Sequence, residues 1–370
     1  MTGKNPPASA LDGEQVNNAK AYFGILSGLV FLLFIPGTST AHVKWFCSTA
    51  DPSVPPLALH AVITPLFGAC LLAFALLLSA GTMTDHWLSQ RWPALAKTIP
   101  ATRPFEEKLM RVAVGAFFLC LWDKGAVVPW SQSDGAILTP ELVSGAPWIN
   151  TVQFAIAAAL LWRRTCPLAA VGIVIVYAAG VADYGLFHLT DYLFFLGIAG
   201  YLALTGPRFP SLERWRVPLL CASLSASLMW TAIEKFLYPQ WTVSVLIVHP
   251  NITAGLAPQV VTVIAGFVEF TLAFFISAGR GLLRVGAIIL LSIFAVAVPE
   301  FGHLDAVGHF TIIAILGIVG LHGVSALQER LRPAHSNSAL LDAGTTVAIY
   351  LGLLTSFMIS YYQLQAIQYR

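Results

Sequence analysis

Apolar runs of about 20 residues, separated by short polar stretches, recur along the chain after residue 21. Such a run is long enough to cross a bilayer as a helix, the one local structure that satisfies its own backbone hydrogen bonds in hydrocarbon. The pattern predicts an all-α polytopic membrane helical bundle with about 11 transmembrane helices. The expected spans are residues 22–41, 57–81, 109–130, 148–163, 166–186, 189–206, 217–238, 258–278, 282–299, 306–325 and 342–362.

The charges between these spans predict an orientation. Basic residues follow the even-numbered spans, as Arg163 and Arg164 follow the fourth and Arg280 and Arg284 follow the eighth. The positive-inside rule places these loops in the cytoplasm. We therefore expect a multi-pass protein of the plasma (inner) membrane, with a cytoplasmic N-terminal tail (residues 1–21) and an extracytoplasmic C-terminus. We interpret residues 22–41 as the first span rather than as a cleaved signal peptide, because the apolar run is long.

Composition agrees with a membrane protein whose main partner is the lipid bilayer. Of the 370 residues 57% are hydrophobic and 10% are charged, whereas about a quarter of a soluble domain is charged. The sequence has no basic arm or zinc-finger spacing, so no nucleic-acid partner is expected. It also lacks the motifs of hydrolases and nucleotide-dependent enzymes. Several tryptophans are expected at the outer membrane interface, namely Trp122, Trp130, Trp148, Trp230 and Trp241.

Residues 109–206 and 217–325 form an internal repeat of four spans each. Asp123-Lys124 of the first copy corresponds to Glu234-Lys235 of the second, and Gln153 corresponds to Glu269. Because four is an even number of spans, both copies insert in the same direction, which predicts two parallel four-helix units. Each fourth helix also carries two glycines four residues apart at its small-residue motif, Gly197-Ile-Ala-Gly200 and Gly317-Ile-Val-Gly320; such spacing favours close helix packing. A helix pair (22–81) precedes the units and one helix (342–362) follows them.

Two stretches resemble a known family. The run from Leu109 to Phe118 before Asp123-Lys124, and Gly266-Phe-Val-Glu269-Phe followed by Ala278-Gly-Arg280, are similar to the four-helix unit of DoxX-like membrane proteins. The resemblance covers about 109–325 and is stronger in the second copy. It implies a membrane subunit of an extracytoplasmic redox system, such as a thiosulfate:quinone oxidoreductase, with quinone as cofactor and an extracytoplasmic redox protein as partner. The first copy departs from the family by carrying Gln153 where a glutamate is expected.

Most carboxylate and histidine side chains are expected at the outer end of the spans, whereas the cytoplasmic loops are expected to hold arginine and lysine with few such mixtures. The outer group is Asp123, Lys124, Asp183, His188, Asp191, Glu234, Lys235, Glu300, His303, Asp305 and His309. Glu269 lies in the middle of an apolar span, where a charge needs a partner. We expect that partner to be Lys235. The pair either fixes helix packing or handles protons or substrate.

The densest cluster runs from Glu300 to His309, with His303 and Asp305 expected in a turn and His309 at the start of the next helix. Three interpretations stay open: a metal site, an acid–base site that accepts protons or oxidises quinol, and helix capping. We do not expect a metal, because the geometry of a turn position is undetermined. We do not expect haem either, because the His309 and His322 pair has no counterpart on a second helix.

The leading hypothesis is a quinone-engaging or proton-handling subunit of an extracytoplasmic redox system. The candidate catalytic residues are Glu234, Lys235, Glu269, Glu300, His303 and His309, and the candidate cofactor-binding residues are Asp123, Lys124 and His188. Two alternatives come from other classes of protein. One is a transporter or channel for a small polar solute, and the other is a non-catalytic assembly subunit.

Overall fold

The computed structural model describes residues 50–92, 102–124, 135–139, 141–205, 211–331 and 338–369. The first expected span, 22–41, and Trp130 lie outside these ranges. Within them the long elements are all α-helices, and extended backbone is limited to one isolated bridge between Ala136 and Val143. Eight helices are long and apolar enough to cross a membrane. The prediction of an all-α membrane bundle is therefore confirmed.

The longer helices follow one another with short connections. They are α4 (Pro65–Arg91), α5 (Arg103–Asp123), α6 (Trp148–Ala159), α7 (Cys166–Tyr184), α9 (Leu193–Ala203), α10 (Arg216–Leu237), α11 (Pro239–Val248), α12 (Pro258–Ala278), α13 (Gly281–Phe301), α14 (His303–His322) and α16 (Ala339–Tyr369). Short elements lie between them: α3 (Leu59–Val62), η3 (Arg163–Thr165), α8 (Leu186–Leu189), η4 (Thr190–Tyr192), η5 (Glu213–Trp215), η6 (Pro250–Thr253) and α15 (Ala326–Leu331).

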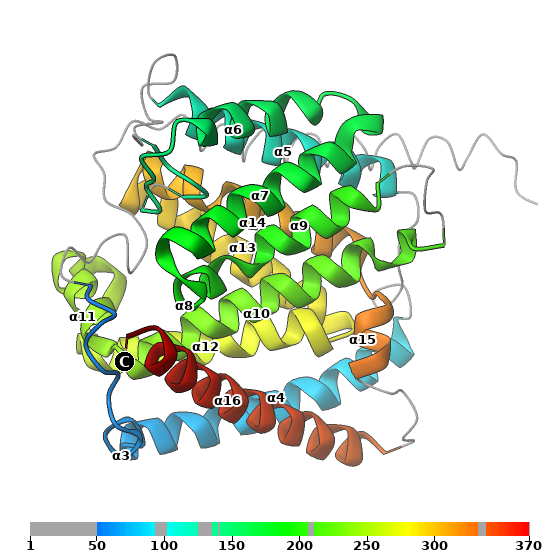
Figure 1. The fold of residues 1–370 in the computed structure, drawn as a ribbon. Helices are drawn as coiled ribbons and strands as arrows, with labels where there is room; N and C mark the ends of the chain where they lie inside the picture. The colour runs from blue at the N-terminus through cyan, green and yellow to red at the C-terminus, as the bar shows by residue number, and fades with distance from the viewer. Residues whose placement is uncertain are drawn as a thin grey trace, which may run out of the picture.

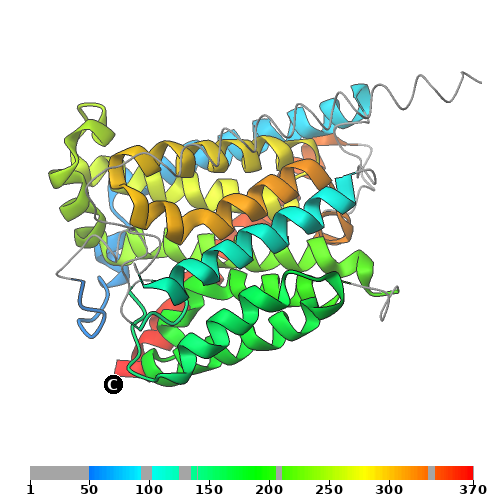
Figure 2. The same cartoon turned by 90° about the horizontal axis from the view of Figure 1, so that it is seen from above.

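The long helices lie roughly side by side, so the bundle has two ends (Figure 1). Helices α3, α8 and α11 lie at one end, which we call the α11 end, and α15 lies at the other, which we call the α15 end. Both α5 and α10 run from the α15 end to the α11 end (Figure 2). Asp123-Lys124 and Glu234-Lys235, near the C-terminal ends of these two helices, therefore lie at the same end of the bundle.

Helix α10 occupies the centre of the bundle. It packs against α9 on one side and α12 on the other, and it also contacts α14 and α16. Helix α5 packs between α6 and α14, while α4 and α16 pair with each other along α12 (Figures 1 and 2). Apolar side chains point outward from the peripheral helices, as Leu72 and Leu76 do on α4 and Ile288 and Val296 do on α13. An apolar exterior of this kind suits a bilayer rather than water.

Several expected boundaries agree with the structure and others do not. The spans 258–278 and 282–299 match α12 and α13 closely. The span 57–81 is shifted, because α4 starts at Pro65 after the Thr64 side chain caps its N-terminus. It then continues to Arg91. Where one span was expected over 189–206, the chain instead forms α8, η4 and α9 in succession.

Close packing at the glycine motifs is confirmed for one copy only. A Cβ atom at Gly197 would lie 1.7 Å from Ser223 Oγ and 3.0 Å from the Leu219 carbonyl oxygen, so glycine allows α9 to approach α10. At Gly317 the nearest atom would be 3.7 Å away, which is ordinary contact. The two copies therefore use the same motif differently.

Candidate functional site

Lys235 and Glu269 form an ion pair between α10 and α12 at the α11 end, as the sequence predicted. Lys235 Nζ donates to Glu269 Oε2, and the Thr231 hydroxyl lies 3.3 Å from Glu269 Oε1. The side chains of Lys235 and Glu269 are 12% and 17% exposed. Thr231 precedes Lys235 by one helical turn, so both face α12. Pairing offsets much of the cost of placing two charges among apolar helices.

Glu234 points in another direction from its neighbour Lys235, because consecutive helix residues are about 100° apart. It accepts a hydrogen bond of 2.9 Å from the hydroxyl of Tyr361 on α16. Tyr361 is fully buried, and its ring lies 4.6 Å from that of Trp230 and 4.8 Å from that of Phe187. This acid therefore joins α10 to α16 through an aromatic cluster.

The aromatic cluster corrects the expectation of interfacial tryptophans. Trp230 and Trp241 are only 1% and 2% exposed. Tyr361 packs on Trp230, and Tyr238 stacks on Trp241 with ring centroids 4.1 Å apart. Helix α16 covers this face of α10, so it removes both residues from the membrane interface. Trp122 and Trp148 are 40% and 45% exposed.

Asp191 and His309 face a small internal cavity between η4, α10, α13 and α14. The cavity measures about 20 Å³, and Thr231 also lines it. That volume suffices for one water molecule. Asp191 is 7% exposed and His309 is 4% exposed, and His309 Nδ1 lies 2.9 Å from Asp305 Oδ1. We call this the inner cavity.

A larger cavity of about 200 Å³ lies beside it at the α11 end, and we call it the outer cavity. Its walls include His188, Asp191 and the rings of Tyr184, Tyr192 and Trp241. His188 Nε2 is 2.7 Å from the Tyr369 hydroxyl, which positions the imidazole. Asp191 lines both cavities.

These contacts arrange acid–base groups in a series. Asp191 connects the outer cavity to the inner one, Thr231 lines the inner cavity, and Thr231 contacts the Lys235–Glu269 pair. Carboxylate, imidazole and hydroxyl groups within hydrogen-bond reach of each other, or of one water, can exchange protons. The arrangement can therefore bind a polar aromatic molecule outside and move protons inward.

The predicted cluster from Glu300 to His309 is divided by the fold. Glu300 contacts His249 at the C-terminal end of α11, with Oε1 2.9 Å from Nδ1, whereas His309 is buried in the bundle. The expected turn at His303 and Asp305 is wrong. Gly302 has a φ of 81° that reverses the chain, and α14 begins at the next residue, His303. The side chain of His303 lies outside the described part of the structure.

The described residues contain no group of three or more His, Cys, Asp and Glu side chains arranged as metal ligands.

The first copy lacks a counterpart of the ion pair. Gln153, which replaces the glutamate, is fully buried and its amide nitrogen donates to the carbonyl oxygens of Ala136 and Ile137, the latter at 3.0 Å. It thus holds the loop before α6. Of the three expected cofactor-binding residues, His188 lines the outer cavity, whereas Asp123 and Lys124 line none of the cavities found among the described residues.

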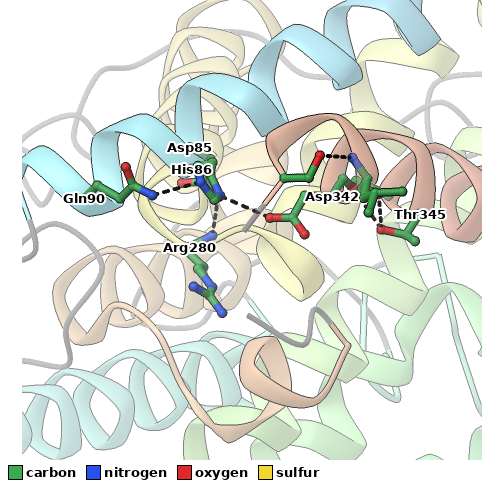
Figure 3. Close-up of polar contacts among 9 residues, drawn as sticks. Asp85, His86, Gln90, Arg280, Asp342 and Thr345 are labelled. Carbon is green, nitrogen blue, oxygen red and sulfur yellow. Dashed lines mark hydrogen bonds and ion pairs between the residues drawn. The ribbon is translucent and has the colours of Figure 1, made fainter. Parts of the chain in front are cut away.

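The α15 end corrects the expectation that carboxylate and histidine groups gather at one end only. Asp85, fully buried on α4, accepts hydrogen bonds of 2.9 Å from the backbone N–H groups of Arg280 and Leu282 (Figure 3). It thereby caps α13 from another helix. Beside it, His86 Nδ1 lies 3.1 Å from Asp342 Oδ2 and joins α4 to α16 (Figure 3).

Two further acids at this end come from the first turns of α5. Glu106 Oε2 lies 3.1 Å from His322 Nδ1 on α14, and Glu107 Oε1 lies 3.0 Å from Arg163 Nε. Both are buried, at 2% and 8% exposed. The adjacent acids of Glu106-Glu107 in an arginine-rich region were the sequence signal for such pairs.

Sequence reasoning also missed the position of Asp191 in the site. Its signal was a carboxylate inside an expected apolar span.

Comparison of the chain with models of known protein families gives no match, and comparisons with curated proteins and with solved structures give none either. The DoxX-like resemblance therefore stays a prediction. The functional argument rests on the geometry of the two ends.

Proposed function

We propose that the protein is a membrane subunit of a quinone-linked redox system, which binds a quinone headgroup in the outer cavity and exchanges protons through Asp191. The observation that carries the proposal is that Asp191 lines both cavities. A group placed in this way can serve a bound molecule on one side and a proton path on the other.

The walls of the outer cavity suit a quinone. The ring of a quinone needs flat apolar surfaces, which Trp241, Tyr184 and Tyr192 provide. Its two oxygens need hydrogen-bond donors, which His188 and a protonated Asp191 provide. Reduction of a quinone to a quinol consumes two electrons and two protons. An extracytoplasmic redox protein would supply the electrons, and Asp191 would deliver protons from the inner cavity.

The packing of the helices supports the proposal of two parallel four-helix units, α5–α6–α7–α9 and α10–α12–α13–α14. The fourth helix of each unit packs on the first helix of the other, α9 on α10 and α14 on α5. Reciprocal contacts of this kind are what a pseudo-two-fold axis would produce. We further propose that α5 and α6 cross the membrane with the eight long apolar helices.

The distribution of charge supports an orientation with the α15 end in the cytoplasm and the C-terminus outside. Arg103, Arg163 and Arg214 belong to elements that start at the α15 end, as do Arg280 and Arg284. The positive-inside rule assigns such an end to the cytoplasm of a plasma membrane protein. The quinone site would then face the extracytoplasmic surface.

Tryptophan fluorescence quenching tests the proposal, because Trp241 forms part of the cavity wall. The protein in nanodiscs is titrated with decylubiquinone, and Asp191→Asn is compared with Glu300→Gln, an equal charge change at an exposed acid of the same end. We expect saturable quenching in the wild type and in Glu300→Gln. The affinity of Asp191→Asn should fall at least about tenfold, the effect of one hydrogen bond to a charged group.

Equal affinity in both variants, or quenching that never saturates, would contradict a quinone site at Asp191. The solute-transport alternative has less support, because among the described residues no side chain lines both the cavity at the α15 end and either cavity at the α11 end. An assembly subunit without a cofactor would show no saturable quenching by decylubiquinone.

A further inference from the structure

A second cavity of about 200 Å³ opens at the α15 end, next to the first turn of α10. Three arginines line it, Arg103 from α5, Arg214 from η5 and Arg216 from α10. Tyr201 and His322 form other parts of the wall. None of these residues belongs to the proposed quinone site.

Arg216 is buried with donors that have no acceptor. The residue is 6% exposed, yet its Nε and Nη2 atoms make no hydrogen bond. Its nearest carboxylates are Glu213, 3.5 Å from Nη1, and Glu107, 3.6 Å from Nη2. The guanidinium lies over the ring of Tyr201, 4.1 Å from the centroid, which fixes its plane. Buried N–H groups nearly always find a partner, so these donors indicate a ligand with acceptor oxygens.

The helix adds to this preference for an anion. Arg216 is the first residue of α10, a helix of 22 residues, so the positive end of its dipole lies at the cavity. The carboxylates in the wall are partly occupied: Glu106 contacts His322 and accepts from Thr102, while Glu213 faces Arg216. Glu329 is the remaining acid of the wall, and it is exposed.

We infer that this cavity binds a phosphate group. Three guanidinium groups around a helix N-terminus match a group with several charged oxygens better than they match a carboxylate, which has two. The phosphate belongs either to a lipid headgroup or to a soluble phosphate. The cavity lies at a bundle end, where lipid headgroups would lie beside it.

Two probes distinguish these sources with the full chain, delipidated in detergent. Inorganic phosphate is titrated against chloride at constant ionic strength while the thermal midpoint is followed. Dioleoylphosphatidate is compared with dioleoylglycerol, which has the same acyl chains without phosphate, by native mass spectrometry. The test variant is Arg216→Gln, and Arg164→Gln is the matched control, because Arg164 is an exposed arginine of the same end that does not line the cavity.

The wild type and Arg164→Gln should bind one phosphate probe, and Arg216→Gln should bind it at least about tenfold more weakly. Binding of inorganic phosphate identifies a soluble ligand, and retention of phosphatidate alone identifies a lipid. If Arg216→Gln does not fold, Arg103→Gln replaces it, since Arg103 is exposed and should weaken binding several-fold. The inference is overturned if neither probe binds, or if the cavity variant and Arg164→Gln bind equally.

Discussion

The two ends of the bundle use the same kinds of side chain in different ways. At the α15 end, acids contact histidines, arginines or helix N-termini, as Glu106 contacts His322 and Asp85 caps α13. At the α11 end, arginine is absent from the walls of both described cavities, and Asp191 and His309 line them instead. Acids that already hold a cation or an N–H group stabilise the fold. Acids that face a cavity are available to a ligand or a proton.

Breaking the Lys235–Glu269 pair should have the largest effect on stability. Lys235→Met leaves Glu269 without its cation between α10 and α12, and loss of one partner of a buried pair costs about 3 kcal/mol or more. Thermal unfolding in detergent measures the loss. The double variant Lys235→Met/Glu269→Leu should recover most of it, because no charge then remains. A single variant as stable as the wild type would show that the pair is solvated.

Removing the cap at the α15 end should cost less. Asp85→Ala leaves the N–H groups of Arg280 and Leu282 without their acceptor, and loss of a helix cap costs up to about 2 kcal/mol. Asp85→Asn keeps one acceptor oxygen and should lose about half as much. The same unfolding assay applies, with exposed Asp183→Asn as control. An Asp85→Ala protein that unfolds like the control would refute the capping role.

Substitution at Asp191 should separate function from stability. Asp191→Asn keeps the size of the side chain, so the free energy of unfolding should change by about 1 kcal/mol or less. The pH dependence of decylubiquinone binding should disappear, because asparagine does not titrate. Fluorescence titrations at several pH values, alongside unfolding curves, measure both. A large loss of stability with unchanged pH dependence would place Asp191 with the structural acids of the α15 end.

The smallest effect is expected at the junction of α4 and α16. His86 contacts Asp342, with side chains 23% and 13% exposed, and pairs near the surface contribute about 0.2–1 kcal/mol. His86→Ala should therefore lower stability by less than about 1 kcal/mol. The effect should shrink as pH rises, because the neutral imidazole loses its attraction to the carboxylate. A loss comparable to that of Lys235→Met would mean that α16 depends on this junction.

Elements and contacts between neighbouring helices could be predicted from the sequence. Helix α12 was predicted with its correct ends, because Pro258 and Gly279 flank a continuous apolar run. The Lys235–Glu269 pair was predicted because each charge stood in an apolar helix next to the other in chain order. Both inferences need only local composition and the cost of a lone charge in a membrane.

Contacts between distant parts of the chain could not be predicted in this way. Asp85 and Arg280 are 195 positions apart, and His86 and Asp342 are 256 apart. The role of Asp191 depends on the break between α8, η4 and α9, which the apolar pattern conceals. His309 was expected at a helix start, yet α14 begins six residues earlier, since Gly302 alone makes the reversal.

Infrared difference spectroscopy between high and low pH tests most directly whether acids at the α11 end titrate while those at the α15 end stay paired. The C=O band of buried protonated carboxyl groups is compared in the wild type, Asp191→Asn and Glu106→Gln, both acids being buried. We predict a titrating band that Asp191→Asn removes and Glu106→Gln retains. A band that survives in Asp191→Asn and disappears in Glu106→Gln would contradict the account.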